Sequence, residues 1–332
     1  YYLLIIAVAA VAAFVILFTL VPALIIDKAV FGSRQDKNPR FKYFTPEEFG
    51  LSVEPFEVKY CGINLAANLY SVKPVERCER VVIFQHGFGA GSASYMTEIA
   101  HFAKQGFAVV AVDAYGCNNS AGKNVKGFYA GAEAVIAAYI GVNCDERLKN
   151  KKVILVGHSW GAYSVLAACG SIKVDGVVAM SGFCAPAQCV CDTLKAMGSA
   201  GRFYAPLIHG WLCIINFFKL GAKGNTKADR AVKSSGVKTL IIHGEKDKAV
   251  GYKNSAANKV QGDDVSCVLL PDKGHNPYNT VSAETKLAEL TGKHDFADEA
   301  EAAEYFTAFD WKAVTEEDAD VMRIIDEFIE NA

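Results

Sequence analysis

The sequence has no dense cluster of Lys or Arg, and its formal net charge is only −2 over 332 residues. A nucleic-acid-binding surface needs concentrated positive charge to displace the counterions of the phosphate backbone. Paired zinc-ligand spacings are also lacking among the ten cysteines, and Cys184, Cys189 and Cys191 have no evident fourth ligand nearby. We therefore predict no nucleic-acid partner and no bound metal.

Charge is absent from the first 26 residues, in which only Thr19 and Pro22 interrupt an aliphatic and aromatic run. A bilayer core needs about 20 apolar residues as a helix, whereas a signal-peptide core has about 7–15. The run predicts a single-pass membrane anchor over residues 1–26, followed by a polar linker over residues 27–50. The alternatives are a cleaved signal peptide, with a small-residue site at Val21-Pro22-Ala23 and a secreted product, and a buried core helix. Basic residues after the run favour a cytoplasmic domain, but only one flank can be read, so the side of the membrane stays open.

We expect residues 51–332 to form one α/β domain. The hydrophobic fraction of the whole chain, 52%, is ample for its core. Short apolar runs alternate with segments of helical spacing, which indicates a mainly parallel sheet flanked by helices. The expected strands are Val81–Gln85, Ala108–Val112, Val153–Val156, Gly176–Met180, Thr239–Ile242 and Val265–Leu270. A hairpin turning at Cys61-Gly62 should add antiparallel edge strands. The segment from about 184 to 235 is too long for a simple crossover, and we expect it to form a small helical cap.

The stretch "VILVGHSWGAYS", residues 153–164, places Ser159 between two glycines after an apolar strand. A sharp turn from strand to helix needs small residues there and exposes the serine as a nucleophile. A serine needs a base, and the base needs an orienting acid. His275 and Asp247 each follow an expected strand, at the sheet edge where catalytic groups of open α/β sheets gather. Glu245 and Asp272 are alternative acids.

The glycine-rich stretch "FQHGFGAGS", residues 84–92, ends another strand. We expect the backbone N–H of Phe88, together with that of Trp160, to form an oxyanion hole. His86 is expected to shape this loop rather than to act as a second base. The stretch lacks the Lys-Ser/Thr of a P-loop and the full dinucleotide spacing, so no cofactor is predicted.

These motifs resemble those of the α/β-hydrolase superfamily, in particular its serine hydrolases of the lipase, esterase and S33-like peptidase type. The resemblance rests on "HGFGAG", "VDAYG", "GHSWGA", "HGEKDKAV" and "DKGH" and covers roughly Val53 to the C-terminus. It implies the α/β-hydrolase fold, with a helical cap and, outside the family pattern, an N-terminal membrane helix. One departure is Asn118 in "DAYGCNNS", where relatives often carry a glycine.

The expected activity is that of a carboxylesterase- or lipase-like serine hydrolase, which cleaves a small-molecule or lipid acyl ester through an acyl-enzyme on Ser159, His275 and Asp247. The alternatives are a peptidase or thioesterase of the same fold, and a non-catalytic binding protein built on that fold. Within the expected cap, Trp211 and Phe217 belong to an apolar stretch that could line an acyl pocket or touch the bilayer. The sequence leaves the physiological substrate and the oligomeric state open.

Overall fold

The computed structural model describes residues 1–292 and 294–332 and contains a mainly parallel sheet of eight strands. The strand order is β1-β4-β6-β5-β7-β8-β9-β10, and β1 and β4 are antiparallel at one edge. The bounds are β1 Ser52–Pro55, β4 Ala67–Ser71, β5 Arg80–Gln85, β6 Ala108–Val112, β7 Lys152–His158, β8 Gly176–Met180, β9 Thr239–Gly244 and β10 Val265–Leu270. All six strands expected in the parallel part of the sheet are thereby confirmed.

The antiparallel edge is more elaborate than the single hairpin expected from the sequence. Strands β2, Val58–Tyr60, and β3, Ile63–Leu65, form a separate two-stranded hairpin that turns at Cys61-Gly62 as predicted. Both turn residues have positive φ, +48° and +78°, which suits a tight hairpin turn. The flanking strands β1 and β4 pair with each other and attach to the main sheet through β6.

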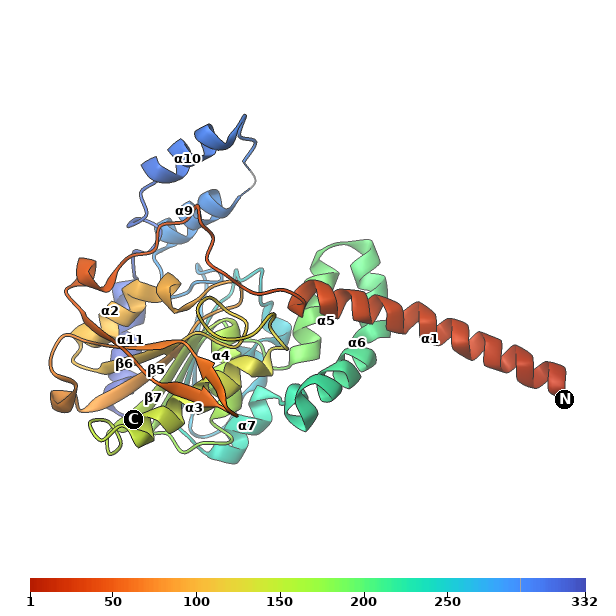
Figure 1. Ribbon diagram of the computed structural model, residues 1–332, viewed down its shortest axis with the longest axis horizontal. Coiled ribbons are helices and arrows are strands. Elements are labelled where there is room, and N and C mark those ends of the chain that lie inside the picture. The colour runs from red at the N-terminus through yellow and green to blue at the C-terminus, as the bar shows by residue number, and fades with distance from the viewer. Residues whose placement is uncertain (293) are drawn as a thin grey trace.

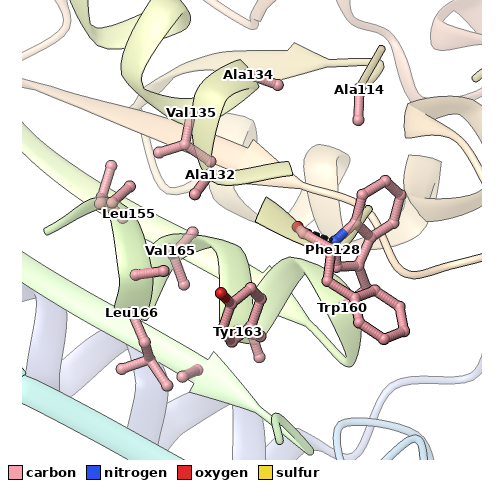
Figure 2. Close-up of a cluster of buried hydrophobic side chains, with 14 of the residues drawn as sticks. Ala114, Phe128, Ala132, Ala134, Val135, Leu155, Trp160, Tyr163, Val165 and Leu166 are labelled. Carbon is pink, nitrogen blue, oxygen red and sulfur yellow. Dashed lines mark hydrogen bonds between the residues drawn. The ribbon is translucent and has the colours of Figure 1, made fainter. Parts of the chain in front are cut away.

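Helices cover both faces of the sheet. Alternate residues of each strand point to opposite sides, so a single strand can contribute to both cores. In β5, Val81 and Ile83 join the core shared with α3, Tyr129–Cys144, and α4, Trp160–Ala168, whereas Val82 and Phe84 join the core on the other face. That second core includes α2, Met96–Lys104, and α11, Ala319–Glu330. Figure 2 shows part of the first core, where the indole N–H of Trp160 of α4 donates to the carbonyl oxygen of Phe128 at 2.6 Å. Tyr163 of α4, Val135 of α3 and Leu155 of β7 belong to the same cluster.

Helix α1, Tyr2–Phe31, projects from the domain (Figure 1) and continues five residues beyond the predicted boundary at Ile26. Its end belongs to the domain core, because Ala23 and Phe31 are buried. Beside it lie α5, Pro186–Ala196, and α6, Ser199–Leu220, in the region expected as a cap (Figure 1). Two helical stretches, Tyr2–Phe31 and Ser199–Ser235, are long and apolar enough to cross a membrane by length and composition.

The remaining helices complete the layers around the sheet. Helix α7, Ala228–Ser235, packs on α4, and α8, Ala256–Lys259, contacts both β9 and β10. Between β10 and α11 the chain forms α9, Val281–Thr291, and α10, Glu299–Ala308, which stand away from the sheet (Figure 1). Leu290, Phe306 and Val314 form a small core of their own there.

Candidate active site

Ser159 lies at the sharp turn between β7 and α4, where its backbone has φ +57° and ψ −115°. The turn depends on the two flanking glycines because neighbouring backbones approach closely. A Cβ on Gly157 would lie 2.3 Å from the carbonyl oxygen of Gly161, and one on Gly161 would lie 2.0 Å from that of Gln85. The sequence "GHSWG" thus has its two glycines where the strand and the helix approach each other, and the turn presents the serine at the carboxyl edge of the sheet.

The structure brings Ser159, His275 and Asp247 into one hydrogen-bonded chain. Ser159 Oγ lies 2.9 Å from His275 Nε2, and His275 Nδ1 lies 2.8 Å from Asp247 Oδ2. The other carboxylate oxygen of Asp247 accepts hydrogen bonds from the backbone N–H groups of Ala249 and Val250 at 2.8 and 2.9 Å. The three residues come from the ends of three different strands, and the acid is fixed by its own loop.

The environment of Asp247 keeps it ionised. Burial raises the pKa of its carboxyl, but the hydrogen bond and charge of His275, with the backbone N–H of Val250, outweigh burial and lower that pKa below its ordinary value. Of the alternative acids, Glu245 is exposed, and Asp272 is an exposed partner of Lys246 at 3.1 Å. Asp247 is therefore the carboxylate that orients His275.

A second layer behind His275 was not foreseen from the sequence. The backbone N–H of Gly87 donates to the hydroxyl of Tyr95 at 3.0 Å, and this hydroxyl lies 2.9 Å from His158 Nδ1. His158 Nε2 in turn lies 2.8 Å from the carbonyl oxygen of His275. Burial, with His275 nearby, lowers the pKa of His158 to about 3, so His158 is neutral and donates from Nε2. His158 was in view beside Ser159 in the motif, but no sequence signal marked Tyr95.

The N–H groups of Phe88 and Trp160 occupy the positions expected for oxyanion donors, one in the loop after β5 and the other at the first residue of α4. Among the described residues, neither N–H has a protein acceptor. His86 shapes this loop as predicted, because its Nδ1 lies 2.8 Å from the carbonyl oxygen of Gly87 and its Nε2 accepts from the N–H of Ala114 at 3.1 Å. Burial lowers the pKa of His86, which favours the neutral ring that this arrangement needs.

The last residue of α1 and the segment after it, both within the expected linker, contact the loop after β5 and the loop after β6. The ring of Phe31 packs edge to face against that of Phe88, with centroids 6.1 Å apart. Gln35 pairs with the 116–118 stretch through two backbone hydrogen bonds of 2.9 and 3.0 Å. The guanidinium of Arg34 donates to the carbonyl oxygens of Asn118, Ser120 and Gly122. These contacts join the end of α1 to the loops that surround Ser159.

Asn118 occupies a left-handed backbone conformation, with φ +41°. Asparagine tolerates that region better than most residues, which explains how it stands where related sequences often have glycine. Asp113 and Ser120 hold the rest of the loop: Asp113 Oδ1 accepts from the N–H of Ser92 at 2.8 Å, and Ser120 Oγ bonds to the backbone of Asp113 and Ala66. The departure from the family pattern therefore leaves the loop intact.

A cavity of about 460 Å³ opens beside Ser159 and His275. Its walls come from four segments: the chain after α1, the loop and helix after β5, the stretch after His275, and α9 with the residues that follow α10. Its apolar lining includes Phe41, Phe44, Met96, Leu287, Leu290, Trp311 and Val314. The sequence placed none of these at the site, because they are scattered along the chain without a motif.

The structure does not bring Trp211 and Phe217 to this cavity. Trp211 Nε1 donates to Thr19 Oγ1 of α1 at 2.9 Å, and Phe217 lies on the outer side of α6, with 53% of its surface exposed. The expectation of an acyl pocket at these residues is thus corrected, because α6 packs against α1 rather than over Ser159. Within residues 1–292 and 294–332, no group of three His, Cys, Asp or Glu side chains is arranged to hold a metal ion.

Residues 80–215 match the family model described as alpha/beta hydrolase fold. A comparison with curated proteins finds no match. Among solved structures, the esterase Pf2001 of Pyrococcus furiosus is similar at 17% identity and a TM-score of 0.56, over 75% of this chain and 94% of that one. Est1E of Butyrivibrio proteoclasticus is similar at 18% identity and 0.51, over 71% and 96%. The acetyl xylan esterase of Paenibacillus sp. R4 is similar at 15% identity and 0.52, over 73% and 83%. With its sheet, its serine turn and this family match, the chain has the α/β-hydrolase fold.

Proposed function

We propose that the protein is a serine hydrolase that cleaves an acyl ester through a covalent acyl-enzyme on Ser159. The observation that carries the proposal is the chain of hydrogen bonds from Ser159 through His275 to Asp247. A neutral hydroxyl is a poor nucleophile, and an adjacent imidazole held by a carboxylate is the arrangement that activates it.

In the proposed reaction, His275 Nε2 takes the proton of Ser159 Oγ as this oxygen attacks the substrate carbonyl. The N–H groups of Phe88 and Trp160 stabilise the oxyanion that forms. His275 then gives its proton to the leaving oxygen, the carbonyl–oxygen bond breaks, and the acyl group stays on Ser159. A water molecule, deprotonated by His275, attacks the acyl-enzyme, and the proton returns to Ser159 Oγ as the acid leaves.

Esters are proposed as substrates because the cavity beside Ser159 offers an apolar wall to an acyl chain, and because two of the similar structures are of esterases. Amides and thioesters can follow the same steps, so a substrate panel must include them. The fold is shared with a Pyrococcus horikoshii acylaminoacyl peptidase at 13% identity, over 77% of this chain and 44% of that one.

The decisive experiment replaces the proposed nucleophile. We expect Ser159→Ala to abolish labelling by a fluorophosphonate and to lower kcat on a nitrophenyl ester by about 10⁶-fold, the loss seen when a serine protease loses its nucleophile. The matched control is Ser94→Ala, because Ser94 lines the same cavity. Labelling of Ser159→Ala at the wild-type level would refute the proposal.

We also propose that α1 anchors the protein in a membrane. Support comes from its length of 30 residues, a mean hydropathy of 3.1 over an 18-residue stretch of the helix and the exposure of the large apolar side chains of its first half. The alternative, a signal sequence, predicts a mature chain that starts near Ala23. Mass spectrometry of the membrane-associated protein tests this, since a mature start near Ala23 would contradict the anchor.

A further inference from the structure

Helix α6 exposes an apolar face that no other part of the described chain covers. Phe203, Leu207, Ile214, Phe217 and Phe218 are between 41% and 82% exposed. Phe203, Leu207, Gly210, Ile214 and Phe217 follow one another at steps of four and three residues, so they lie along one side of the helix. A contiguous apolar patch of this kind marks an interaction surface.

This face lies directly beside α1. Phe18 of α1 contacts both Phe203 and Tyr204, with ring centroids 6.4 and 5.6 Å apart. Further along, Trp211 donates to Thr19, and Lys219 forms an ion pair of 2.9 Å with Asp27. The residue numbers of these contacts increase together along the two helices. Helix α6 therefore runs in the same direction as α1, and both helices end near the domain. The exposed apolar surfaces of the two helices are therefore continuous at Phe18 and Phe203.

A basic side chain borders the domain end of this face. Lys223 is exposed just after α6, at the end of this face that lies near the domain. Basic side chains at the borders of an apolar helix face reach lipid phosphates while the apolar residues enter the acyl region.

From these observations we propose that α6 docks on the lipid bilayer with its face Phe203–Phe218, next to the inserted α1. The bilayer, rather than a second protein, is the occupant because this face continues the surface of a helix whose apolar run is itself suited to lipid. The proposal rests on the proposed anchoring of α1 and is independent of the hydrolase chemistry.

The test places a tryptophan on the face in the full-length protein. Phe218→Trp is reconstituted into vesicles of phosphatidylcholine and phosphatidylglycerol, with and without bromine on the acyl chains, and the loss of tryptophan emission is compared with that of the wild type. Two matched variants serve as controls. Ile5→Trp, on the exposed part of α1, is the positive control, and Ile140→Trp, on the exposed side of α3, is the negative control. The three native tryptophans contribute the same background to every variant.

We expect bromine to quench Phe218→Trp and Ile5→Trp beyond the wild type and to leave Ile140→Trp at the wild-type level. If Ile5→Trp is quenched and Phe218→Trp is not, the anchor stands and the docking proposal is overturned; a dimer that Phe217→Glu dissociates would then identify a second copy as the occupant. If neither is quenched, both the anchor and the docking fail. Hydrolysis enters none of these readouts, so the fate of the hydrolase proposal is decided separately.

Discussion

Ser159 holds its hydroxyl on a backbone conformation that few non-glycine residues adopt. Such strain costs about 1–3 kcal/mol and persists only when the surroundings over-determine it. Here the conformation of Ser159 is imposed by three features: strand β7, the close contact between Gly157 and Gly161, and the hydrogen bond from the N–H of Ser159 to the carbonyl of Met180. The strain is located at the residue proposed to react, where it lifts Oγ away from the helix.

The choice of acid can be tested by exchanging carboxylates for amides. We expect Asp247→Asn to lower kcat by about 10⁴-fold, because an amide at this position favours the wrong tautomer of His275. Glu245→Gln should retain wild-type turnover, since Glu245 is exposed, two residues away in the same loop. Steady-state kinetics on one nitrophenyl ester decides the matter, and a larger loss in Glu245→Gln would reverse the assignment.

Glu98 supplies a pH-dependent stability term near the site. It is only 5% exposed, and burial, with the charge of Glu317, raises the pKa of its carboxyl to about 8. The folded protein thus keeps a proton that the unfolded chain releases above its ordinary pKa of 4.5. The free energy of unfolding therefore falls as the pH rises from 4.5 to 8, by at most about 1.4 kcal/mol per pH unit.

Glu98→Gln removes this titration while keeping the shape of the side chain. We expect its stability relative to wild type to increase between pH 4.5 and pH 8, as measured by urea unfolding at both pH values. The exposed Glu79→Gln serves as the control and should show no such trend. A stability difference for Glu98→Gln that is equal at the two pH values would contradict the assignment.

At the scale of elements, the end of α1 is part of the active-site scaffold. Phe31 packs against Phe88, whose N–H is a proposed oxyanion donor, and its ring also lies 4.9 Å from that of Phe128. Removing an oxyanion donor costs about 10²–10³ in kcat, so loosening one should cost less, about tenfold. We expect Phe31→Ala to show this loss in kcat with little change in KM.

The control for this prediction is the same substitution elsewhere on the helix. Phe14 is 66% exposed and stacks on Phe18 within α1, so Phe14→Ala should leave kcat unchanged. Equal kinetics for both variants would show that α1 does not position Phe88, whatever its role in the membrane.

Sequence patterns predicted the elements that have a strong local signal. The six parallel strands are apolar runs rich in β-branched residues, so their positions follow from local chemistry. Ser159, His275 and Asp247 could be proposed because each follows a strand end, and strand ends converge in this kind of sheet. The cavity could not be predicted, since Phe44, Leu290 and Val314 meet only through long-range packing. Trp211 was misplaced for a related reason: an apolar helix does not reveal from its sequence which partner covers it.

At the scale of the whole molecule, the cavity beside Ser159 draws on segments from both ends of the chain. A buried methylene contributes about 0.8 kcal/mol, which corresponds to about a fourfold gain per carbon while the cavity fills. We expect kcat/KM for nitrophenyl esters to rise from acetyl to medium chain lengths. A steady decline from acetyl upward would contradict an apolar acyl site.

The same series locates that site. Val314→Trp should shorten the preferred chain, because Val314 lines the cavity, whereas Phe217→Ala should leave the preference unchanged, because Phe217 points away from it on α6. The opposite outcome would return the acyl site to α6.

The contacts of Phe31, Arg34 and Gln35 also determine how the site is mounted. If a flexible linker followed a membrane-anchored helix, the domain could rotate freely above the lipid surface and would meet substrate in any orientation. In this protein the end of the helix and the residues just after it contact the loops around Ser159, so the helix holds the domain in a fixed orientation. With α1 inserted in a bilayer as proposed, the mouth of the cavity would be held at one height and in one orientation above the lipid, and a substrate that diffuses in the plane of the membrane would meet it in a constant orientation.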